Sequence, residues 1–497
     1  MRLVAALAVV VLGCSPCLAV TRYVNAGLTT GANNGTSWAD AYRTSDGLRL
    51  AIAASTAGDE IWVAAGTYKP TPTATRTIAF TPRTGIAVYG GFGGTETDRS
   101  QRNIAANVTI LSGDLANNDP IITDNSHNVV RGNGTTNAGT FDGFTVTGGN
   151  ANGSSASDSD RGGGMIFLNG ANATIRNCII TGNRVIFGGG GTYLRSASPT
   201  FVDCVWRSNA GASFGGAIDM FTNCAPTFTR CEFSNNAANR AGGVEVFGTC
   251  NPLFTNCVFR NNNAGTATGG ALYIASSSTV TIRNCTFASN TTTGSSGSAI
   301  TTTGSTTRIF NSIVWGNTGP GGSTANQVAG STTLAGSSNI QGGFTGEGNI
   351  NLAPGFVSQA TGDLRLLAGS PCIDAANNTN VDVNNVLDFL LQTRRVDDPA
   401  TIDTGIGTAP IADMGAIEYQ PPAGPTCDTI DFNNDGSSFD PQDVDAFFSV
   451  FSEGDCIPTT ATCNDIDFNN DASLFDPCDV DSFLLVFSEG PCTPCGQ

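Results

Sequence analysis

Two short acidic segments near the C-terminal end carry the residues best suited to hold a metal ion. Each contains the pattern Asp-x-Asn-x-Asp, which places three oxygen donors on alternate residues, and two more aspartates follow. Carboxylate and amide oxygens are the ligands that Ca²⁺ takes in such loops. The pattern therefore predicts two calcium sites. Their ligands are Asp431, Asn433, Asp435, Asp440 and Asp443 in the first loop, and Asp467, Asn469, Asp471, Asp476 and Asp479 in the second.

The charge of the chain is concentrated around these loops. Residues 427–497 hold 15 acidic residues and no Lys or Arg, and so supply −15 of the formal net charge of −18. Carboxylates at this density repel one another unless a cation or solvent relieves the repulsion. The rest of the chain, with 26 acidic and 23 basic residues, is nearly neutral. It lacks the clustered cations that nucleic acid requires, so no nucleic-acid partner is expected.

An apolar stripe follows each loop at the spacing of one helix face. Positions i, i+3, i+4 and i+7 are apolar in both copies, which predicts two loop–helix units whose stripes pack on each other. The stripes are Val444, Phe447, Phe448 and Phe451, and Val480, Phe483, Leu484 and Phe487.

The duplicated unit, spaced by 36 residues and bounded by cysteines in each copy, resembles the GC-type dockerin module of exported bacterial proteins. The resemblance covers residues 423–497 and implies calcium-dependent attachment to a cohesin-like or cell-surface partner. It leaves the disulfide pairing open. Two departures weaken it: the last carboxylate stands at loop position 13 instead of 12, and Ala472 replaces the turn glycine that Gly436 supplies. The alternative is an acidic, disulfide-linked tail without metal.

Most of the preceding chain is a repeat of about 27 residues. A cysteine column and an asparagine column, five positions apart, recur together, and a glycine run keeps the same period. About 27 residues accommodate three short strands and three turns, with no room for a helix. The columns are Cys178, Cys204, Cys231, Cys257 and Cys285; Asn183, Asn209, Asn236, Asn262 and Asn290; and Gly164, Gly191, Gly216, Gly243 and Gly270.

Stacked coils place equivalent side chains on top of one another. We expect the cysteines to form a buried column of small apolar side chains; the alternative is metal or redox chemistry. The asparagines suit a left-handed turn and could hydrogen-bond along the axis. Cys224 and Cys250 form a separate column, with a disulfide as one alternative. Two apolar rows should line the interior: Ile175, Phe201, Phe228, Phe254, Ile282 and Ile309, and Ile180, Trp206, Phe233, Phe259, Phe287 and Val314.

The repeats resemble right-handed parallel β-helix proteins of the pectate-lyase-like kind and the repeats of polymorphic outer-membrane proteins. The motif GGAI occurs at Gly215–Ile218, and FxxN occurs three times. The resemblance implies an all-β, right-handed parallel β-helix over residues 20–422. We expect an N-terminal cap (20–100) with a helix over 37–54 and a strand over 60–68, then coils (101–340) and a closing segment (341–422).

The N-terminus resembles an export signal. Arg2 precedes an apolar run, and cleavage is expected near Ala19, so that residues 1–19 form the signal peptide. A lipoprotein signal at Cys14 is the alternative. No later segment is apolar over the length of a transmembrane helix. The protein is therefore expected to be secreted or at the cell surface.

Catalysis would need paired carboxylates or a carboxylate group beside a basic residue. The repeat region offers Asp219 and Glu245, which we expect on neighbouring coils, one residue out of register, with Arg240 nearby. Asp158, Asp160 and Arg161 lie in a loop insertion, and His127 and Lys69 are the only His and Lys. No catalytic residue is assigned. The expected function is a surface or matrix protein that binds polysaccharide or mediates adhesion; the alternative is a lyase or glycoside hydrolase acting on acidic polysaccharide.

Overall fold

The computed structural model describes residues 19–134, 139–266, 268–330, 332–382, 386–422 and 441–451, with a few isolated positions beyond them. The chain divides into two compact units. The first holds residues up to Val396 and Asp403–Tyr419; the second holds Asp397–Ile402 and the chain from Gln420.

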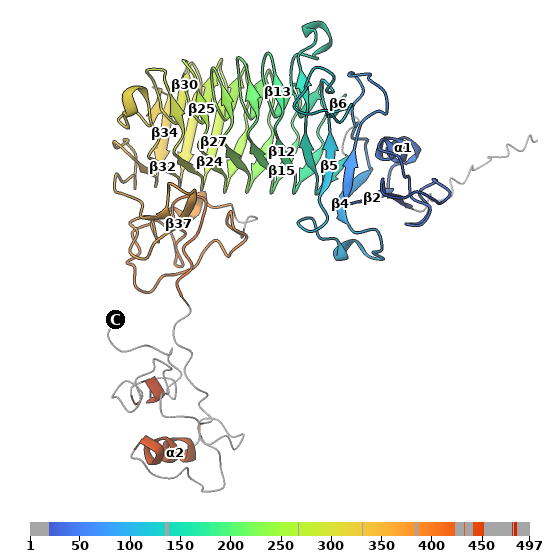
Figure 1. The fold of residues 1–497 in the computed structure, drawn as a ribbon. Helices are drawn as coiled ribbons and strands as arrows, with labels where there is room; N and C mark the ends of the chain where they lie inside the picture. Colours follow the sequence, from blue (N-terminus) through green and yellow to red (C-terminus); the bar gives the residue numbers. More distant parts are fainter. Residues whose placement is uncertain are drawn as a thin grey trace, which may run out of the picture. The chain divides into compact units, whose positions relative to one another are not determined.

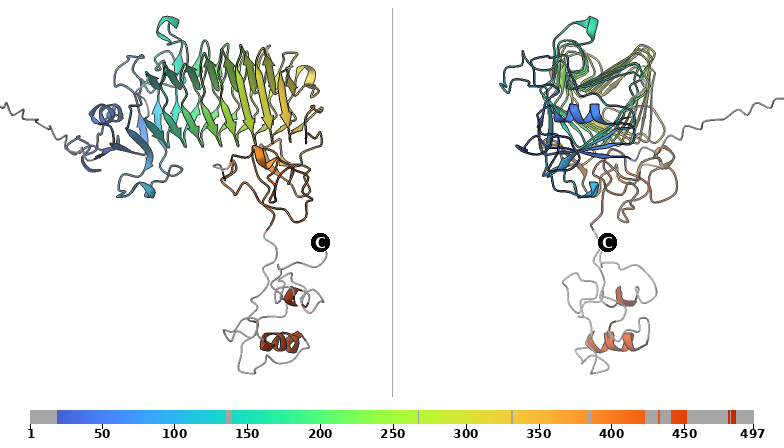
Figure 2. Two further views of the ribbon diagram at one scale, coloured as in Figure 1. Left: turned by 180° about the vertical axis from the view of Figure 1, so that it is seen from behind. Right: turned by 90° about the vertical axis from the view of Figure 1, so that its right-hand side faces the viewer.

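The first unit is a parallel β-solenoid (Figure 1). Four sheets run along its length, and successive coils add one strand to each sheet, so that neighbouring strands belong to neighbouring coils. A view along the axis shows the coils stacked on one another (Figure 2). We call the sheets A to D.

Sheet A has 11 strands and sheet B has 10. The strands of sheet A are β1 (Thr21–Val24), β2 (Glu60–Ala64), β4 (Ala87–Phe92), β7 (Thr140–Asp142), β11 (Thr174–Arg176), β15 (Thr200–Val202), β19 (Thr227–Thr229), β23 (Leu253–Thr255), β27 (Thr279–Arg283), β31 (Thr306–Phe310) and β34 (Thr333–Gly336). Those of sheet B are β3 (Gly66–Tyr68), β5 (Thr109–Ser112), β8 (Thr145–Thr147), β12 (Ile179–Thr181), β16 (Val205–Arg207), β20 (Glu232–Ser234), β24 (Val258–Arg260), β28 (Thr286–Ala288), β32 (Ile313–Trp315) and β35 (Asn339–Ile340).

Sheet C has eight strands and sheet D has six. The strands of sheet C are β6 (Val130–Asn133), β10 (Met165–Leu168), β14 (Thr192–Arg195), β18 (Ile218–Phe221), β22 (Val244–Phe247), β26 (Leu272–Ala275), β30 (Ile300–Thr303) and β33 (Val328–Ala329). Those of sheet D are β9 (Asn150–Ala151), β13 (Arg184–Val185), β17 (Ala210–Gly211), β21 (Ala237–Ala238), β25 (Asn263–Ala264) and β29 (Thr291–Thr292). The antiparallel pair is β36 (Phe356–Ser358) with β37 (Asp363–Leu366).

The predicted interior rows are confirmed. All 12 side chains of the two apolar rows are fully buried, as are the five cysteines of the column. The rings of Phe233 and Phe259 stack with centroids 4.5 Å apart, and Trp206 stacks on Phe233 at 5.1 Å. The coils thus share one aromatic and aliphatic core. All eight cysteines in the described part of the chain are free thiols, including the adjacent pair Cys224 and Cys250.

The asparagine column forms a continuous ladder of hydrogen bonds. Each side-chain amide donates to the side-chain oxygen of the next coil, as from Asn209 to Asn236 (3.1 Å) and from Asn236 to Asn262 (3.0 Å). The expectation of left-handed backbone at these asparagines is wrong. The positive φ falls on the residue just before each one, such as Ser208 and Asn235, because the column residue must turn its amide inward to meet its neighbours.

The N-terminal cap is less helical than expected. Helix α1 spans only Gly47–Ala54 and packs against β1 and β2 at the end of the solenoid (Figure 1). The chain before it cannot be helical because Tyr42 pairs with β1: its backbone N–H donates to the carbonyl of Tyr23. The strand expected over 60–68 is present as two strands, β2 and β3, which lie in different sheets.

The closing segment lies along the side of the solenoid. Leu364 and Ile417 pack against Val258 of β24 and Ala288 of β28, on the outer face of sheet B. The backbone N–H of Gly415 donates to the carbonyl of Asn311 (2.8 Å). This segment therefore covers sheet B and contributes a second small apolar core. Short 3₁₀ turns lie at Arg99–Gln101 (η1), Ser155–Ser157 (η2), Pro320–Gly322 (η3) and Asn378–Asn380 (η4).

The second unit contains helix α2 (Pro441–Phe451). Phe447 of α2 stacks on Phe483, with centroids 4.1 Å apart, so the apolar stripes of the two copies meet as predicted. Phe448 and Leu484 are 43% and 44% exposed, which makes the buried stripe narrower than expected. No helix among the described residues is long and apolar enough to span a membrane.

Candidate functional site

One of the ten predicted calcium ligands lies in the described part of the chain. Asp443 is fully buried in the first turn of α2, where the helix dipole favours a carboxylate. The other nine, Asp431, Asn433, Asp435, Asp440, Asp467, Asn469, Asp471, Asp476 and Asp479, lie outside the described residues, so the calcium sites stay a prediction.

Asp219 and Glu245 occupy the outer face of sheet C. The expectation that they are one residue out of register is wrong, because they are direct partners in the pairing of β18 with β22. This coil is 26 residues long, because Phe214 likewise pairs with Arg240, and Ala217 rather than Gly216 is the equivalent of Gly243. The backbone N–H groups of Ala217 and Ile218 both donate to the carbonyl of Gly243, which fixes this register.

The two carboxylates are buried. Asp219 is 4% exposed and Glu245 is 2% exposed. Burial raises the pKa of Asp219 well above its usual range, and the neighbouring Glu245 raises it further. Burial also raises the pKa of Glu245, against the opposing hydrogen bonds from Arg240. The guanidinium of Arg240 forms an ion pair with Glu245 and lies over the ring of Phe214 at 4.4 Å. The charge of Glu245 is therefore balanced within the protein by Arg240.

The charges of the loop insertion lie on the same face and are also paired. Asp158 accepts two hydrogen bonds from Arg195 (2.6 and 2.8 Å), and Arg161 contacts both Asp158 and Asp160. Arg161 also stacks on Phe187 at 4.5 Å. The outer face of sheet C thus carries two separate sets of ion pairs, one around Asp158 and one between Arg240 and Glu245.

The single His and the single Lys of the chain are partly or fully buried and interact with neighbouring groups of the fold. Lys69 is 6% exposed, and its Nζ donates to the carbonyl of Leu115 (2.9 Å). Burial and the nearby Arg76 lower the pKa of His127, so its imidazole is neutral at pH 7. The groups that shift the pKa of His127 include none of the four carboxylates Asp158, Asp160, Asp219 and Glu245.

The outer face of sheet A presents a row of hydroxyl groups. Thr140, Thr174, Thr200 and Thr227 pair in register on four consecutive coils, and all four are half-buried. We call them the threonine row. Neighbouring strands are about 4.8 Å apart, and the hydroxyls of Thr227 and Thr200 are within 3.4 Å. The row is therefore a regular array of donors and acceptors.

Towards the N-terminal end, the same face carries aromatic side chains that the sequence analysis did not single out. Tyr23, Trp62 and Tyr89 are register partners on β1, β2 and β4. A signal was available, because Trp62 and Tyr89 are one coil period of 27 residues apart.

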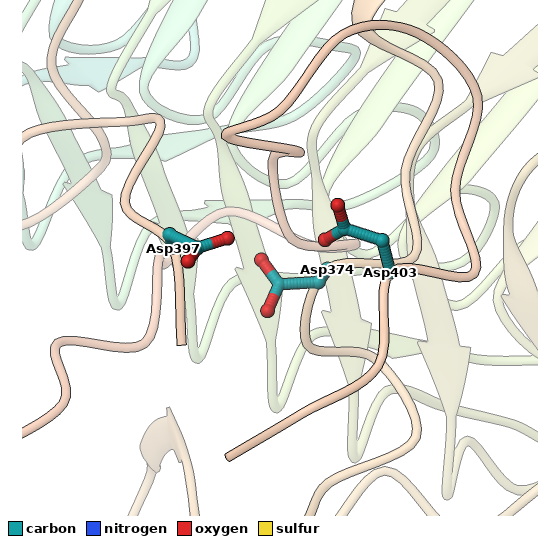
Figure 3. A group of neighbouring side chains, drawn as sticks. All are labelled: Asp374, Asp397 and Asp403. Carbon is teal, nitrogen blue, oxygen red and sulfur yellow. The ribbon is translucent and has the colours of Figure 1, made fainter. Parts of the chain in front are cut away.

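The closing segment holds a further acidic group. The carboxylate oxygens of Asp374 and Asp403 lie within 4.8 Å of each other, with Asp374 buried and Asp403 exposed (Figure 3). Asp397 is drawn with them, but its short segment belongs to the second unit, and the two units are not placed relative to each other. The sequence offered no repeat or spacing that pointed to this pair.

Known proteins resemble this chain in its β-helix fold. A family model described as the right-handed β-helix region matches residues 84–266 and 164–341, together just over half of the chain. The chain belongs to the right-handed β-helix family. Among solved structures, this β-helix is similar to the crystal structure of pectate lyase Pel9A, with a TM-score of 0.48 and 16% identity over 81% of this chain and 97% of that one. The comparison with curated proteins gives no match. The predicted handedness and coil architecture are confirmed.

Proposed function

We propose that this β-helix is an exported surface or matrix protein that binds polysaccharide through the outer face of sheet A. In this proposal the C-terminal module binds Ca²⁺ and attaches the protein to a cohesin-like or cell-surface partner. Export follows from the signal-like residues 1–19, and attachment from the dockerin-like pattern of residues 423–497.

The observation that carries the binding role is the threonine row. Its four half-buried hydroxyls are aligned on four consecutive coils of one parallel sheet. A polysaccharide offers hydroxyl groups at regular intervals along an extended chain, and each Thr hydroxyl can both donate and accept a hydrogen bond. A rigid, periodic array of such groups needs little ordering when it binds an extended ligand.

The carboxylates favour binding over catalysis. A glycosidase or lyase needs an acid or base that reaches the substrate. Asp219 and Glu245 are 4% and 2% exposed, and Glu245 is already paired with Arg240. The alternative function, a lyase or hydrolase of acidic polysaccharide, therefore lacks an accessible acid–base pair at Asp219 and Glu245 on the outer face of sheet C.

The binding role is tested with hydroxyl deletions that keep the shape of the side chain. The variant Thr174→Val/Thr200→Val should lose most of the polysaccharide binding that a glycan array detects for the full-length mature protein. The matched control Thr147→Val/Thr181→Val changes register partners on the outer face of sheet B and should bind normally. Equal binding by both double variants contradicts the proposal. Release of unsaturated sugars from an acidic polysaccharide would establish the lyase alternative.

A further inference from the structure

A groove of about 610 Å³ opens at the N-terminal end of the outer face of sheet A. Its volume is in the range of ligand-binding pockets, roughly 300–1,000 Å³. Tyr23 of β1 and Trp62 of β2 line one side, and the segment around η1 lines the other with Arg99 and Arg102. We call it the N-terminal groove. Glu60, which also lines it, is in register with Thr140 through Ala87 of β4, so the threonine row begins two strands away on the same face.

The aromatic side of the groove is a packed cluster. The rings of Tyr23 and Trp62 meet edge to face, with centroids 5.8 Å apart. Trp62 stacks on Phe92 at 4.8 Å, and Trp38 contacts Tyr23 at 4.8 Å. The indole of Trp38 donates to the carbonyl of Glu96 (2.8 Å), which fixes it in place. Tyr23 is half-buried, so a rigid part of its ring remains accessible to a ligand.

The two arginines of the groove are already paired with carboxylates, and Asp98 adds a further carboxylate to the lining. Arg99 pairs with Glu60 at 2.6 Å and donates to the hydroxyl of Tyr89 (3.0 Å). Arg102 pairs with Asp142 at 2.9 Å. Each guanidinium therefore has a carboxylate partner. The side chains of Arg99 and Glu60 are still 48% and 30% exposed, so both retain donors and acceptors that a ligand can reach.

We propose that the N-terminal groove binds a neutral hexopyranose segment, which seats a polysaccharide chain that continues along the threonine row. The C–H face of a pyranose ring packs on an aromatic ring such as Tyr23. Its hydroxyls match the planar donors of Arg99 and the acceptor oxygens of Glu60. An anionic uronate would have to compete with the carboxylates that already neutralise both arginines. This inference rests on the proposed polysaccharide-binding function and specifies its ligand class.

The test measures binding of a neutral cello-oligosaccharide and of an oligogalacturonate to the full-length protein by calorimetry, at low and high salt. The neutral ligand should bind with an affinity that salt does not change, because no net charge is involved. Tyr23→Leu should weaken this binding about ten-fold, which corresponds to about 1.4 kcal/mol. The matched control Tyr273→Leu changes another half-buried tyrosine on the outer face of sheet C and should bind like the wild type.

A second variant tests the groove without changing the aromatic cluster, whose packing Tyr23→Leu could disturb. Ser100→Leu adds bulk to the groove at an exposed position outside the sheet, and it should weaken binding by a similar factor. Normal binding by both groove variants, together with loss of binding by the Thr174→Val/Thr200→Val variant, refutes the groove and leaves the proposed function intact. Preferential, salt-sensitive binding of oligogalacturonate refutes the neutral ligand class. Absence of binding to both ligands in the wild-type protein and on a glycan array refutes both proposals.

Discussion

Replacement of Asn236 by Asp should make the stability of the solenoid strongly dependent on pH. The amide nitrogen of Asn236 donates to the carbonyl of Trp206 (2.9 Å) and to the side-chain oxygen of Asn262 (3.0 Å). Its own oxygen accepts from the backbone and side-chain nitrogens of Asn209. In Asn236→Asp, an ionised carboxylate oxygen would replace the amide nitrogen at this fully buried position. It would face two acceptors, the carbonyl of Trp206 and the side-chain oxygen of Asn262, without a proton to donate.

The loss of unfolding free energy can be worked out from the pKa of the introduced carboxyl group, which must stay protonated in the folded state. In the unfolded chain an aspartate has a pKa of about 3.9, and each unit of pKa shift corresponds to about 1.4 kcal/mol. A folded state that keeps the carboxyl protonated therefore loses about 4 kcal/mol of stability at pH 7. One O–H replaces two N–H donors, so one acceptor stays unpaired at any pH, at a cost of about 1 kcal/mol. Because the folded-state pKa is raised, stability is lost as the pH rises.

The free energy of unfolding is measured by urea denaturation from pH 4 to pH 8 and compared with the wild type. The expected deficit of Asn236→Asp is about 1 kcal/mol near pH 4 and grows by about 1.4 kcal/mol per pH unit until the folded-state pKa is reached. The control is Asn235→Asp, at an exposed neighbour whose positive φ an aspartate tolerates. A deficit that is independent of pH, or equal in the two variants, refutes the role given to the asparagine ladder.

Three further predictions concern other parts of the chain. Phe233→Ala should destabilise the solenoid by about 3–5 kcal/mol. The control Phe221→Ala, at a ring that is 40% exposed, should cost at most about 1.5 kcal/mol. The midpoints of denaturant unfolding of the two variants are compared. Because burial raises the pKa of Asp219, Asp219→Asn should gain stability over the wild type as the pH rises from 5 to 8, and a constant difference in unfolding free energy would contradict this. Calorimetry on the full-length protein should find two Ca²⁺ ions, with Asp431→Ala losing more affinity than Asp467→Ala; no calcium uptake by the wild type would refute the tail sites.

The interior of the solenoid could be predicted from the sequence because it repeats. Cys204 and Phe233 are each one member of a column, and stacking forces all members of a column into the same environment. The register of Asp219 with Glu245 could not be predicted, since the last glycine of each run does not mark the same position in every coil, and Ala217 rather than Gly216 is the equivalent of Gly243. The helix expected over 37–54 was shortened by a long-range contact, the pairing of Tyr42 with β1.

The asparagine ladder joins the coils from Asn183 to Asn317 through the same set of atoms, so the junctions between these coils are alike. Loss or tandem duplication of one whole coil would rejoin surfaces that already match, and length could therefore change during evolution without a redesign of the core. Each added coil would extend the outer face of sheet A by about 4.8 Å. The length of this face is then a heritable quantity that varies in steps of one coil, while the strands β1, β2 and β4 at its N-terminal end stay unaltered.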